Sequence, residues 1–405
     1  MQSNIKHIIL SGGWGYGNLG DDAILLSSYQ LLKLKYPGCH ITVLSYNVSE
    51  SSSLIPSGNN VSYLDSLHVS IFGYHPKKMT FGNGIISDII RPFKSRIERR
   101  IKPHKNSLLR SRMLKDTDKF LSRYKDVIEP YSNLCRTADL YIMSGGGYLT
   151  NWAEMGISKY YELDIAKRNG LKTYIIGQTI GPFKRNAWKL IEKIFSKTDG
   201  SFFRDKESIK DAVKLGANCL ENVVPDLVLS TERSTQKGNY IVLVPFLSDL
   251  TKNKSKIVDN LASIAAKYNY SVYITVSQLW PYGMQVGLSI YFELLANKIK
   301  AKFIVPQDYK ELSSILSSAQ MTFSQNLHGL ILSYCGHTPV VSLNNRRKFI
   351  SFMEQIGQPN NIFSSANLDK YDFLKCFERK DEFDYSKLHL FRKKIIDAIN
   401  KTIEL

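Results

Sequence analysis

The stretch of the chain best suited to chemistry lies near its N-terminus, where glycines alternate with other residues and two carboxylates follow. Its sequence is Gly15-Tyr16-Gly17-Asn18-Leu19-Gly20-Asp21-Asp22. Glycines adopt positive φ and let backbone N–H groups approach a ligand without a Cβ in the way. The helix expected after them has a partial positive charge at its N-terminus, which suits an anion. We expect one carboxylate to cap that helix and the other to contact a sugar hydroxyl.

A literal match to the pattern G-x-G-x-x-G in this stretch raises the alternative of a dinucleotide site. That fingerprint also needs an acidic residue about 20 positions later, at the end of the second strand, where it binds the ribose. The second strand is expected at residues 41–44, and Ser45, Tyr46 and Asn47 follow it. Because none of them is acidic, the sequence disfavours a dinucleotide cofactor.

The elements around this stretch predict a doubly wound α/β fold. A short apolar run at residues 7–10 is expected to be the first strand, and residues 23–34 have the apolar spacing of a helix. Strand, glycine-rich turn and helix form the opening unit of such a fold. After the second strand we expect a loop over residues 49–60 and a short strand within residues 61–69.

Glycines or charged residues follow each of the later strands expected in the first half. The strands at 138–143, 172–176 and 200–203 are followed by Gly145-Gly146-Gly147, Gly177-Gln178 and Arg204-Asp205, and Asp226 stands at the end of the half. Parallel βα units bring the carboxyl ends of their strands to one edge of the sheet. Open α/β sheets bind ligands at that edge, so several such endings together predict a site.

A second α/β half is expected after a polar linker at residues 231–238. Strands at 240–245, 271–277, 302–306, 321–324 and 339–343 alternate with helices at 256–268, 289–299, 309–319 and 330–335. Two such halves describe the two-lobed GT-B architecture, with two Rossmann-like lobes and a cleft between them. We expect an acceptor lobe over residues 1–230 and a donor lobe over residues 239–405, whose last helix, at 387–404, packs back on the first lobe.

Length and composition are those of a globular chain. At 405 residues the length favours two domains, and a hydrophobic content of 43% excludes a disordered protein. We find no run of about 18 apolar residues that would span a membrane, and we expect no signal peptide. The five cysteines are scattered without metal-ligand spacing, which predicts a reducing compartment, a cytoplasmic location and no metal site.

The formal net charge of +18 predicts an anionic partner. Basic residues are concentrated at 76–125, where we expect an insertion of helices interrupted near Pro103. This segment is either a helical hairpin with solvated basic faces or a surface that docks on the inner face of an anionic membrane or on a lipid-pyrophosphate acceptor. No nucleic-acid-binding module is recognisable, so we expect no nucleic-acid partner.

Several motifs in a fixed order carry a family resemblance. They are GGWGYGNLGDDAIL, SGGGYLT, GQTIGPF, FFRDKES, VPDLVL and LHGLILSYCGHTPVVSL. Their order and spacing resemble the polysaccharide pyruvyl transferases. The resemblance implies transfer of a pyruvyl group from phosphoenolpyruvate to two hydroxyls of a sugar, in a cell-surface polysaccharide such as a capsule or cell-wall polymer or in its lipid-linked precursor. A pyruvate ketal forms and phosphate is released, with no cofactor besides the donor substrate.

The resemblance also implies roles for single residues. His328 matches the family's motif histidine and would act as a general acid or base, since imidazole exchanges protons near neutral pH. Arg204 matches the arginine of an R-D-x-x-S motif and would bind the donor's carboxylate or phosphate. Asp21 matches the first carboxylate of an acidic pair and would contact or deprotonate the acceptor. The structural alternatives are a core or capping role for His328 and a salt bridge from Arg204 to Asp205 or Asp226.

The other site residues expected from the resemblance form two groups. The donor-binding group is Arg204, Asn326, Leu327, His328, Gly329 and Lys348, and the acceptor-binding group is Gly17, Asn18, Asp21, Gly146, Gly147 and Gln178. Gly329 and the helix after it would offer N–H groups to the phosphate. Lys348 would add positive charge, or else it is an ordinary surface lysine.

The chain departs from the family pattern at one position. Family members commonly have Arg-Leu-His where this chain has Asn326-Leu327-His328. Asparagine carries no charge, and loss of a charge-assisted hydrogen bond costs roughly 1.5–3 kcal/mol. Arg346, Arg347 or Lys348 would have to compensate from the neighbouring loop, or else donor binding is weak or the donor differs.

Two alternatives from other classes remain open. The same architecture suits a nucleotide-sugar glycosyltransferase, for which Glu311 and Glu354 are the candidate ribose-binding carboxylates of the second lobe. The chain could also be a non-catalytic scaffold of polysaccharide assembly that has lost donor binding, as Asn326 would allow. The joint presence of His328, Arg204 and Asp21 disfavours the scaffold.

Overall fold

The structure is a computed structural model, and its described residues form two compact units. They are residues 5–58, 60–73, 113, 117–149, 154–183, 188–219, 223–231, 233, 236–246, 250, 253–279, 281–364 and 372–402. Unit 1 comprises Met1–Tyr16, Ile24–Leu227 and Lys393–Leu405, and unit 2 comprises Gly17–Ala23 and Val228–Arg392. Of the basic insertion expected at residues 76–125, all but Met113 and residues 117–125 lies outside the described residues.

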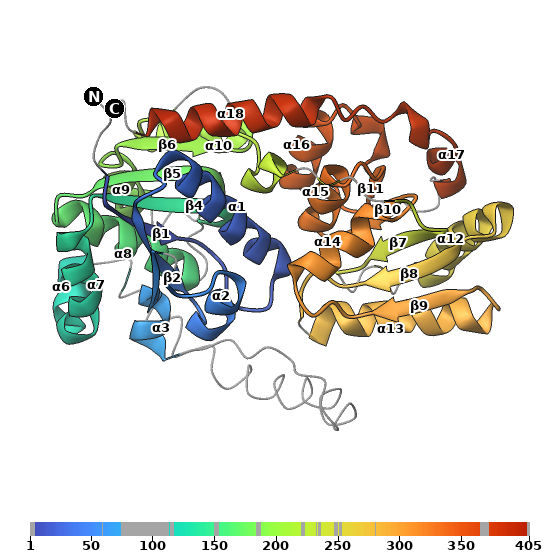
Figure 1. The fold of residues 1–405 in the computed structure, drawn as a ribbon, viewed down its shortest axis with the longest axis horizontal. Helices are drawn as coiled ribbons and strands as arrows, with labels where there is room; N and C mark the ends of the chain where they lie inside the picture. The colour runs from blue at the N-terminus through green and yellow to red at the C-terminus, as the bar shows by residue number, and fades with distance from the viewer. Residues whose placement is uncertain are drawn as a thin grey trace. The chain divides into compact units, whose positions relative to one another are not determined.

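Unit 1 is built on a six-stranded parallel sheet with the order β3-β2-β1-β4-β5-β6 (Figure 1). The strands are β1 (His7–Ser11), β2 (His40–Ser45), β3 (Val61–Asp65), β4 (Leu140–Leu149), β5 (Lys172–Ile180) and β6 (Gly200–Phe203). The chain winds from β1 toward β3 and then from β4 toward β6. The strand order therefore reverses between β1 and β4, which is where such sheets bind ligands, at the carboxyl ends of the strands.

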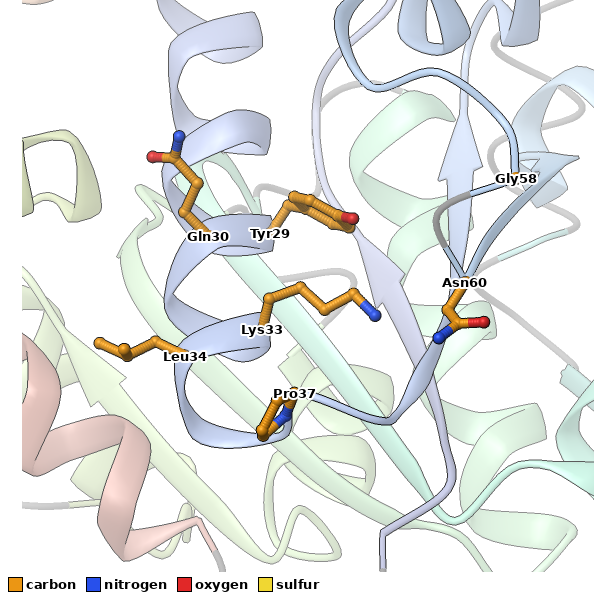
Figure 2. Close-up of a pocket in the computed structure, with 7 residues that line it drawn as sticks. All are labelled: Tyr29, Gln30, Lys33, Leu34, Pro37, Gly58 and Asn60. Carbon is orange, nitrogen blue, oxygen red and sulfur yellow. The ribbon is translucent and has the colours of Figure 1, made fainter.

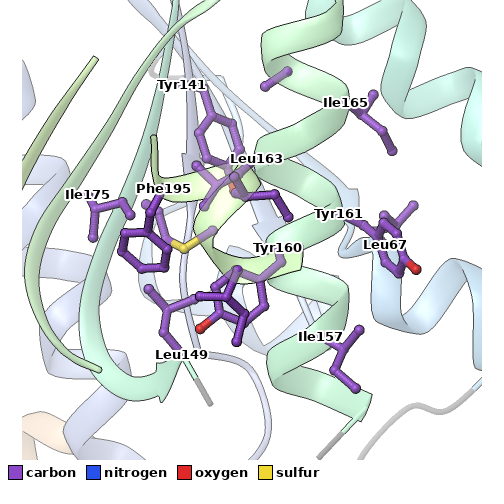
Figure 3. Packing of buried hydrophobic residues seen from close by; sticks show 14 of the residues in the cluster. Leu67, Tyr141, Leu149, Ile157, Tyr160, Tyr161, Leu163, Ile165, Ile175 and Phe195 are labelled. Atoms are coloured by element: carbon purple, nitrogen blue, oxygen red, sulfur yellow. The ribbon is translucent and has the colours of Figure 1, made fainter. Parts of the chain in front are cut away.

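Helices connect these strands. They are α1 (Leu19–Lys35), α2 (Val48–Leu54), α3 (Leu67–Phe72), α6 (Thr117–Arg123), α7 (Lys125–Thr137), α8 (Glu154–Arg168), α9 (Trp188–Phe195) and α10 (Lys206–Lys214). Figure 3 shows side chains of α8, including Ile157, Tyr160 and Leu163, in the hydrophobic core with Ile175 of β5 and Phe195 of α9. Burial of this apolar face holds α8 on the sheet.

A charged pair lies inside this core. Lys159 and Glu162 of α8 are both completely buried, and Lys159 Nζ lies 3.1 Å from Glu162 Oε2. Ser11 at the end of β1 links them, because its Oγ donates to Glu162 at 2.5 Å and accepts from Lys159 at 2.9 Å. Tyr141 donates to the same carboxylate at 3.1 Å. These hydrogen bonds offset the cost of removing two charges from water.

Unit 2 is built on a five-stranded parallel sheet with the order β11-β10-β7-β8-β9 (Figure 1). The strands are β7 (Tyr240–Val244), β8 (Ser271–Thr275), β9 (Ala301–Ile304), β10 (Thr322–Ser324) and β11 (Val340–Ser342). The helices are α12 (Lys254–Tyr268), α13 (Pro281–Ala296), α14 (Tyr309–Ser317), α15 (Leu327–Cys335), α16 (Arg347–Gln355) and α17 (Phe373–Glu378). The last helix, α18 (Lys387–Lys401), begins in unit 2 and ends in unit 1.

One expectation for residues 49–69 is wrong and one is confirmed. The polar stretch expected to be a loop over residues 49–60 contains α2. The short strand expected within residues 61–69 is β3, which ends at Asp65 and is followed by α3. Both helices are short, with seven and six residues, so neither offers enough turns for an apolar period to stand out.

The strands β4 and β5 are longer than the sequence predicts. Instead of ending before their glycines, they continue to Leu149 and Ile180, with register shifts between Gly146 and Leu149 and between Ile176 and Gln178. The glycines form bulges within the paired strands rather than turns after them. Within the described part of the chain, no helix has the length and apolar character to cross a membrane.

His68 in α3 makes unit 1 sensitive to acid. Burial, with a smaller effect from the nearby Lys159 charge, lowers the pKa of His68 from 6.5 to about 4. In the unfolded chain His68 therefore binds a proton near pH 6.5, whereas in the folded chain it binds one only as the pH approaches 4. The stabilising effect of the neutral ring is complete above pH 6.5 and is lost as the pH falls through this window.

We predict that this histidine alone lowers the free energy of unfolding by about 2 kcal/mol between about pH 7 and about pH 5. The check is a series of urea-unfolding midpoints at both pH values for the wild type and for His68→Gln. The variant should lose less stability on acidification by that amount. Equal acid sensitivity of the two proteins would contradict the prediction.

Candidate active site

The segment Gly17–Ala23 belongs to unit 2, where it lies at the carboxyl end of β8. Three backbone contacts hold it: a bridge between Asn18 and Gln278, a hydrogen bond from Leu19 N to Ser277 O at 3.0 Å, and one from Leu279 N to Gly17 O at 2.7 Å. All strands of this sheet are parallel, so their carboxyl ends share one edge. The first turn of α1 is therefore held at the edge where β10 and β11 also end.

Gly20 lies directly against the imidazole of His328. A Cβ built on Gly20 would stand 2.1 Å from Nδ1 and 2.2 Å from Cγ of that ring, well inside van der Waals contact. The φ of Gly20 is not among the positive values, whereas Gly15 and Gly17 have φ of 78° and 77°. Glycine is therefore required at position 20 to make room for His328, not to allow an unusual backbone conformation.

Asp21 stands next to this contact, in the first turn of α1. Its Oδ2 accepts a hydrogen bond of 2.7 Å from Nδ2 of Asn18. Asn18 also caps the helix, because its Oδ1 accepts from Gly20 N at 3.3 Å. The expectation that Asp21 or Asp22 caps α1 is thus wrong, since both lie inside the first turn, where they complement the helix dipole.

Asn326, where the family resemblance implies an arginine, caps α15. Its Oδ1 accepts from His328 N at 2.9 Å and from Gly329 N at 3.2 Å. The cap starts α15 at Leu327, three residues earlier than expected, and it places His328 in the first helical turn. The side-chain oxygen Oδ1 of Asn326 is thus used to cap a helix, which the sequence did not reveal.

The expected phosphate-binding role of Gly329 has to compete with this cap, because its N–H is already donated to Asn326. Gly329 has a packing role as well, since a Cβ there would stand 2.5 Å from Oγ of Ser324. Leu327 is buried at the same helix start. Lys348 lies in the first turn of α16, exposed, with its ammonium 5.6 Å from the centre of the Phe349 ring. Donor binding by these residues stays a prediction.

Arg204 lies in unit 1, at the end of β6, and is almost completely buried. Its Nη1 donates to Asp226 in a buried salt bridge, and its Nε donates to Thr179 Oγ1 at 2.8 Å. Thr179 in turn donates to Asp205, which caps α10 by accepting from Ser208 N at 2.8 Å. The alternative of a salt bridge to Asp226 is therefore observed, and it holds the guanidinium in a fixed orientation.

Gln178 is fully buried at the end of β5, beside the glycines of β4. Its Nε2 donates to Gly145 O and, at 2.5 Å, to Tyr148 Oη. Its Oε1 is buried without a hydrogen-bond partner among the described residues. Rotating the amide would face that oxygen toward the Gly145 carbonyl, and two acceptors would then repel each other. A buried acceptor of this kind costs about 1–3 kcal/mol unless a donor satisfies it.

The opening glycines have a structural use that the sequence analysis did not anticipate. A Cβ on Gly12 would stand 1.9 Å from the ring of Trp14, which is fully buried and donates from Nε1 to Leu44 O at 2.9 Å. Gly15 packs against Ser45 and Asn47, where a Cβ would stand 2.5 Å from Ser45 Oγ. The loop is thus shaped around a buried indole.

The predicted site residues therefore fall into two groups, one in each unit. Unit 2 holds Gly17, Asn18, Asp21, Asn326, Leu327, His328, Gly329 and Lys348, and unit 1 holds Gly146, Gly147, Gln178 and Arg204. The sequence analysis missed Tyr148 and Thr179, which hydrogen-bond Gln178 and Arg204. Both stand in the glycine motifs SGGGYLT and GQTIGPF, so their place beside strand-end glycines was the available signal.

A surface hollow of about 740 Å³ lies elsewhere on unit 1 (Figure 2). Its lining comes from Tyr29, Gln30, Lys33 and Leu34 of α1 and from Pro37, Gly58 and Asn60. Asn60 immediately precedes β3, so the hollow lies at the amino ends of the strands. Ligand sites of open α/β sheets lie at the carboxyl ends, and none of the predicted site residues lines this hollow.

Among the described residues, no cluster of three or more histidine, cysteine or carboxylate side chains could hold a metal ion. Glu311, a candidate ribose-binding residue, instead takes part in the cap of α14. Its N–H donates to the N-cap Asp308 and its Oε2 accepts from Gln307 N, both at 2.8 Å.

A family model described as polysaccharide pyruvyl transferase matches residues 18–347 of the chain. None of the curated proteins matches. Similar solved structures include Staphylococcus aureus MnaA with UDP (TM-score 0.56, 11% identity, 99% of this chain and 97% of that one). The UDP-GlcNAc 2-epimerase of Methanocaldococcus jannaschii has a TM-score of 0.53 and 13% identity, over 92% of this chain and 92% of that one. The UDP-N-acetylglucosamine 2-epimerase of Rickettsia bellii has a TM-score of 0.53 and 10% identity, over 98% of this chain and 96% of that one.

At these identities the likeness concerns the fold alone. It confirms the predicted α/β class with two lobes of the GT-B type. The cleft between the lobes stays a prediction.

Replacing the cap of α15 should cost stability. We predict that Asn326→Ala lowers the free energy of unfolding by about 1 kcal/mol, because two N–H groups lose their acceptor. Asn326→Asp keeps an acceptor oxygen and should stay near the wild type. Denaturant-unfolding midpoints of the three proteins provide the check, and an alanine variant as stable as the aspartate variant would contradict the prediction.

Breaking the buried ion pair between Arg204 and Asp226 should cost more stability than removing the cap of α15. We predict that Arg204→Ala destabilises the fold by about 3–5 kcal/mol, because it leaves Asp226 charged and buried without its partner. The double variant Arg204→Ala with Asp226→Ala should recover part of that loss. A thermodynamic cycle of the single and double variants measures the coupling, and additive effects would contradict it.

Proposed function

The chain belongs to the polysaccharide pyruvyl transferase family, and on that premise we propose that it transfers a pyruvyl group from phosphoenolpyruvate to two hydroxyls of a sugar. The acceptor is a cell-surface polysaccharide or its lipid-linked precursor. The products are a cyclic pyruvate ketal and phosphate. Membership of the family supports a role in polysaccharide modification. The identity of the donor and the ketal chemistry are our proposal.

The observation that carries the proposal is the contact between Gly20 and His328. Two motifs from opposite parts of the sequence meet there, and the carboxylate of Asp21 follows in the same helical turn. An imidazole and a carboxylate on two adjoining helix starts, at the carboxyl edge of a parallel sheet, are suited to proton transfer to and from a bound substrate.

The reaction needs three proton movements. The first sugar hydroxyl gives up its proton as its oxygen bonds to carbon 2 of phosphoenolpyruvate, and the methylene carbon gains a proton and becomes a methyl group. The bond between carbon 2 and the phosphate oxygen then breaks. The second hydroxyl closes the ketal, and its proton leaves with the phosphate. We assign protonation of carbon to His328 and removal of the hydroxyl proton to Asp21.

Unit 1 supplies features that support a sugar acceptor and an anionic donor. The buried Oε1 of Gln178 is an acceptor that a sugar hydroxyl can satisfy. The guanidinium of Arg204 is held by Asp226 and Thr179. A guanidinium fixed in this way is suited to a charge-assisted contact with a carboxylate or phosphate. We assign Gln178, with Gly146 and Gly147, to the acceptor and Arg204 to the donor.

We further propose that the protein works in the cytoplasm, at the inner face of the membrane, where a lipid-linked acceptor is within reach. The formal net charge of +18 supports attraction to an anionic lipid surface. The alternative of a nucleotide-sugar glycosyltransferase has less support, because Glu311 is engaged in a helix cap and Glu354 lies in the last turn of α16, away from the strand ends.

The first test is ligand-dependent stability. We expect millimolar phosphoenolpyruvate to raise the unfolding temperature more than equal phosphate does, because a ligand that binds only the folded state stabilises it. A rise with UDP-GlcNAc and none with phosphoenolpyruvate would contradict the proposal and favour the glycosyltransferase.

The second test is phosphate release from phosphoenolpyruvate in the presence of lipid-linked saccharides extracted from the producing cells. We predict that His328→Gln and Gly20→Ala each reduce the rate about 100-fold or more, the first by removing the acid–base group and the second by displacing it. His337→Asn is the matched control, since it removes another histidine of unit 2 at a position whose φ of 53° suits asparagine. Equal rates in all four proteins would contradict the assignment of His328.

A further inference from the structure

Two neighbouring strands of unit 2 end in the same turn. Ser324 of β10 pairs in register with Ser342 of β11, and an asparagine follows each serine two residues later. Ser324 Oγ donates to the carbonyl of Asn326 at 2.7 Å, and Ser342 Oγ donates to the carbonyl of Asn344 at 2.7 Å. The two turns are therefore copies of one another on adjacent strands.

The repetition extends to the next residues. Asn326 Oδ1 accepts from the backbone N–H of His328 at 2.9 Å, and Asn344 Oδ1 accepts from the backbone N–H of Arg346 at 3.1 Å. Each asparagine side chain thus fixes the backbone of the residue two positions later through a hydrogen bond. The acid–base histidine on one strand end corresponds to an arginine on the next.

The two turns are also joined to each other. Leu343 N donates to Ser324 O at 2.8 Å and so continues the strand pairing beyond β10. Adjacent strands lie about 4.8 Å apart, and an extended arginine side chain spans more than that separation. The turn that leads to Arg346 therefore lies beside the turn that leads to His328.

Arg346 and Asn326 also hold the same position relative to a helix. Asn326 is the N-cap of α15, and Arg346 is the N-cap of α16. The family resemblance implies an arginine at the position of Asn326. In this chain the arginine stands at the equivalent N-cap one strand further along the sheet.

The charge of Arg346 is available for a ligand. Its side chain is exposed, and within the described ranges no carboxylate lies within ion-pair distance of it. The first turn of α16 contains no acidic residue that would neutralise it. Lys348, another of the three cations expected here, has its ammonium 5.6 Å from the centre of the Phe349 ring.

We propose that Arg346 binds the phosphate of the donor beside His328 and so replaces the charge that is absent at Asn326. This inference rests on the proposed function for the identity of the donor. A guanidinium in this place forms a charge-assisted contact with the phosphate oxygens. It also holds the leaving phosphate as the bond to carbon 2 breaks.

The test compares Arg346→Gln with Arg347→Gln, which removes the same charge one residue further along the helix. We expect Arg346→Gln to raise the Kd for inorganic phosphate and the KM for phosphoenolpyruvate about tenfold or more, as loss of one charge-assisted hydrogen bond does. Arg346→Lys should give values of both constants between those of the wild type and Arg346→Gln, because lysine keeps the positive charge but cannot form two parallel hydrogen bonds as a guanidinium does. Arg347→Gln should change both constants less than threefold.

A second comparison moves the charge back. In the Arg346→Gln background, Asn326→Arg places an arginine at the N-cap of α15 and should recover most of the phosphate affinity, while circular dichroism confirms that the fold persists. Unchanged constants in Arg346→Gln, or equal losses in Arg347→Gln, would overturn the proposal. A selective loss of affinity for pyruvate in place of phosphate would also overturn it, since that result assigns Arg346 to the carboxylate.

The outcomes separate this inference from the proposed function. If the wild type releases no phosphate from phosphoenolpyruvate, the proposed function fails, and the binding constants for inorganic phosphate still decide the role of Arg346. If the wild type releases phosphate and Arg346→Gln does so with the same KM, the function stands and Arg346 has no part in it.

Discussion

The arrangement of unit 2 depends on one steric constraint, which is that residue 20 has no side chain and the imidazole of His328 fills its place. Two helix starts meet at this point, and an asparagine caps each of them: Asn18 for α1 and Asn326 for α15. Caps fix the direction of a helix start through the backbone. His328 and Asp21 are thus placed by backbone geometry, which suits the acid–base roles proposed for them.

Unit 1 is governed by a different constraint, the cost of charge in a medium of low dielectric constant. Two buried ion pairs lie in this unit, Lys159 with Glu162 and Arg204 with Asp226. For Arg204 an observed structural role and a proposed binding role therefore share one side chain. Loss of activity in an Arg204 variant has meaning only beside a measured stability, whereas His328 and Arg346 can be probed without removing a buried partner charge.

The fold class and much of its detail could be predicted because strands and helices leave local patterns. The strand at 200–203 matches β6 residue for residue, since it lies between clear helical segments. The bulged extensions of β4 and β5 could not be predicted, because a glycine run is equally typical of a turn. The same holds for α2 and α3, which are too short to show a period.

The sequence by itself determined the family, the two α/β halves and the residue types at the strand ends, because motifs and periodicity are local properties. The tertiary structure decided what each of those residues does. Gly15 and Gly17 adopt positive φ, Gly12 makes room for Trp14, and Gly20 makes room for His328. These uses follow from what lies opposite each glycine. The place of Gly20 depends on the pairing of residues 17–19 with residues 277–279, and no local pattern encodes a contact between segments so far apart in the chain.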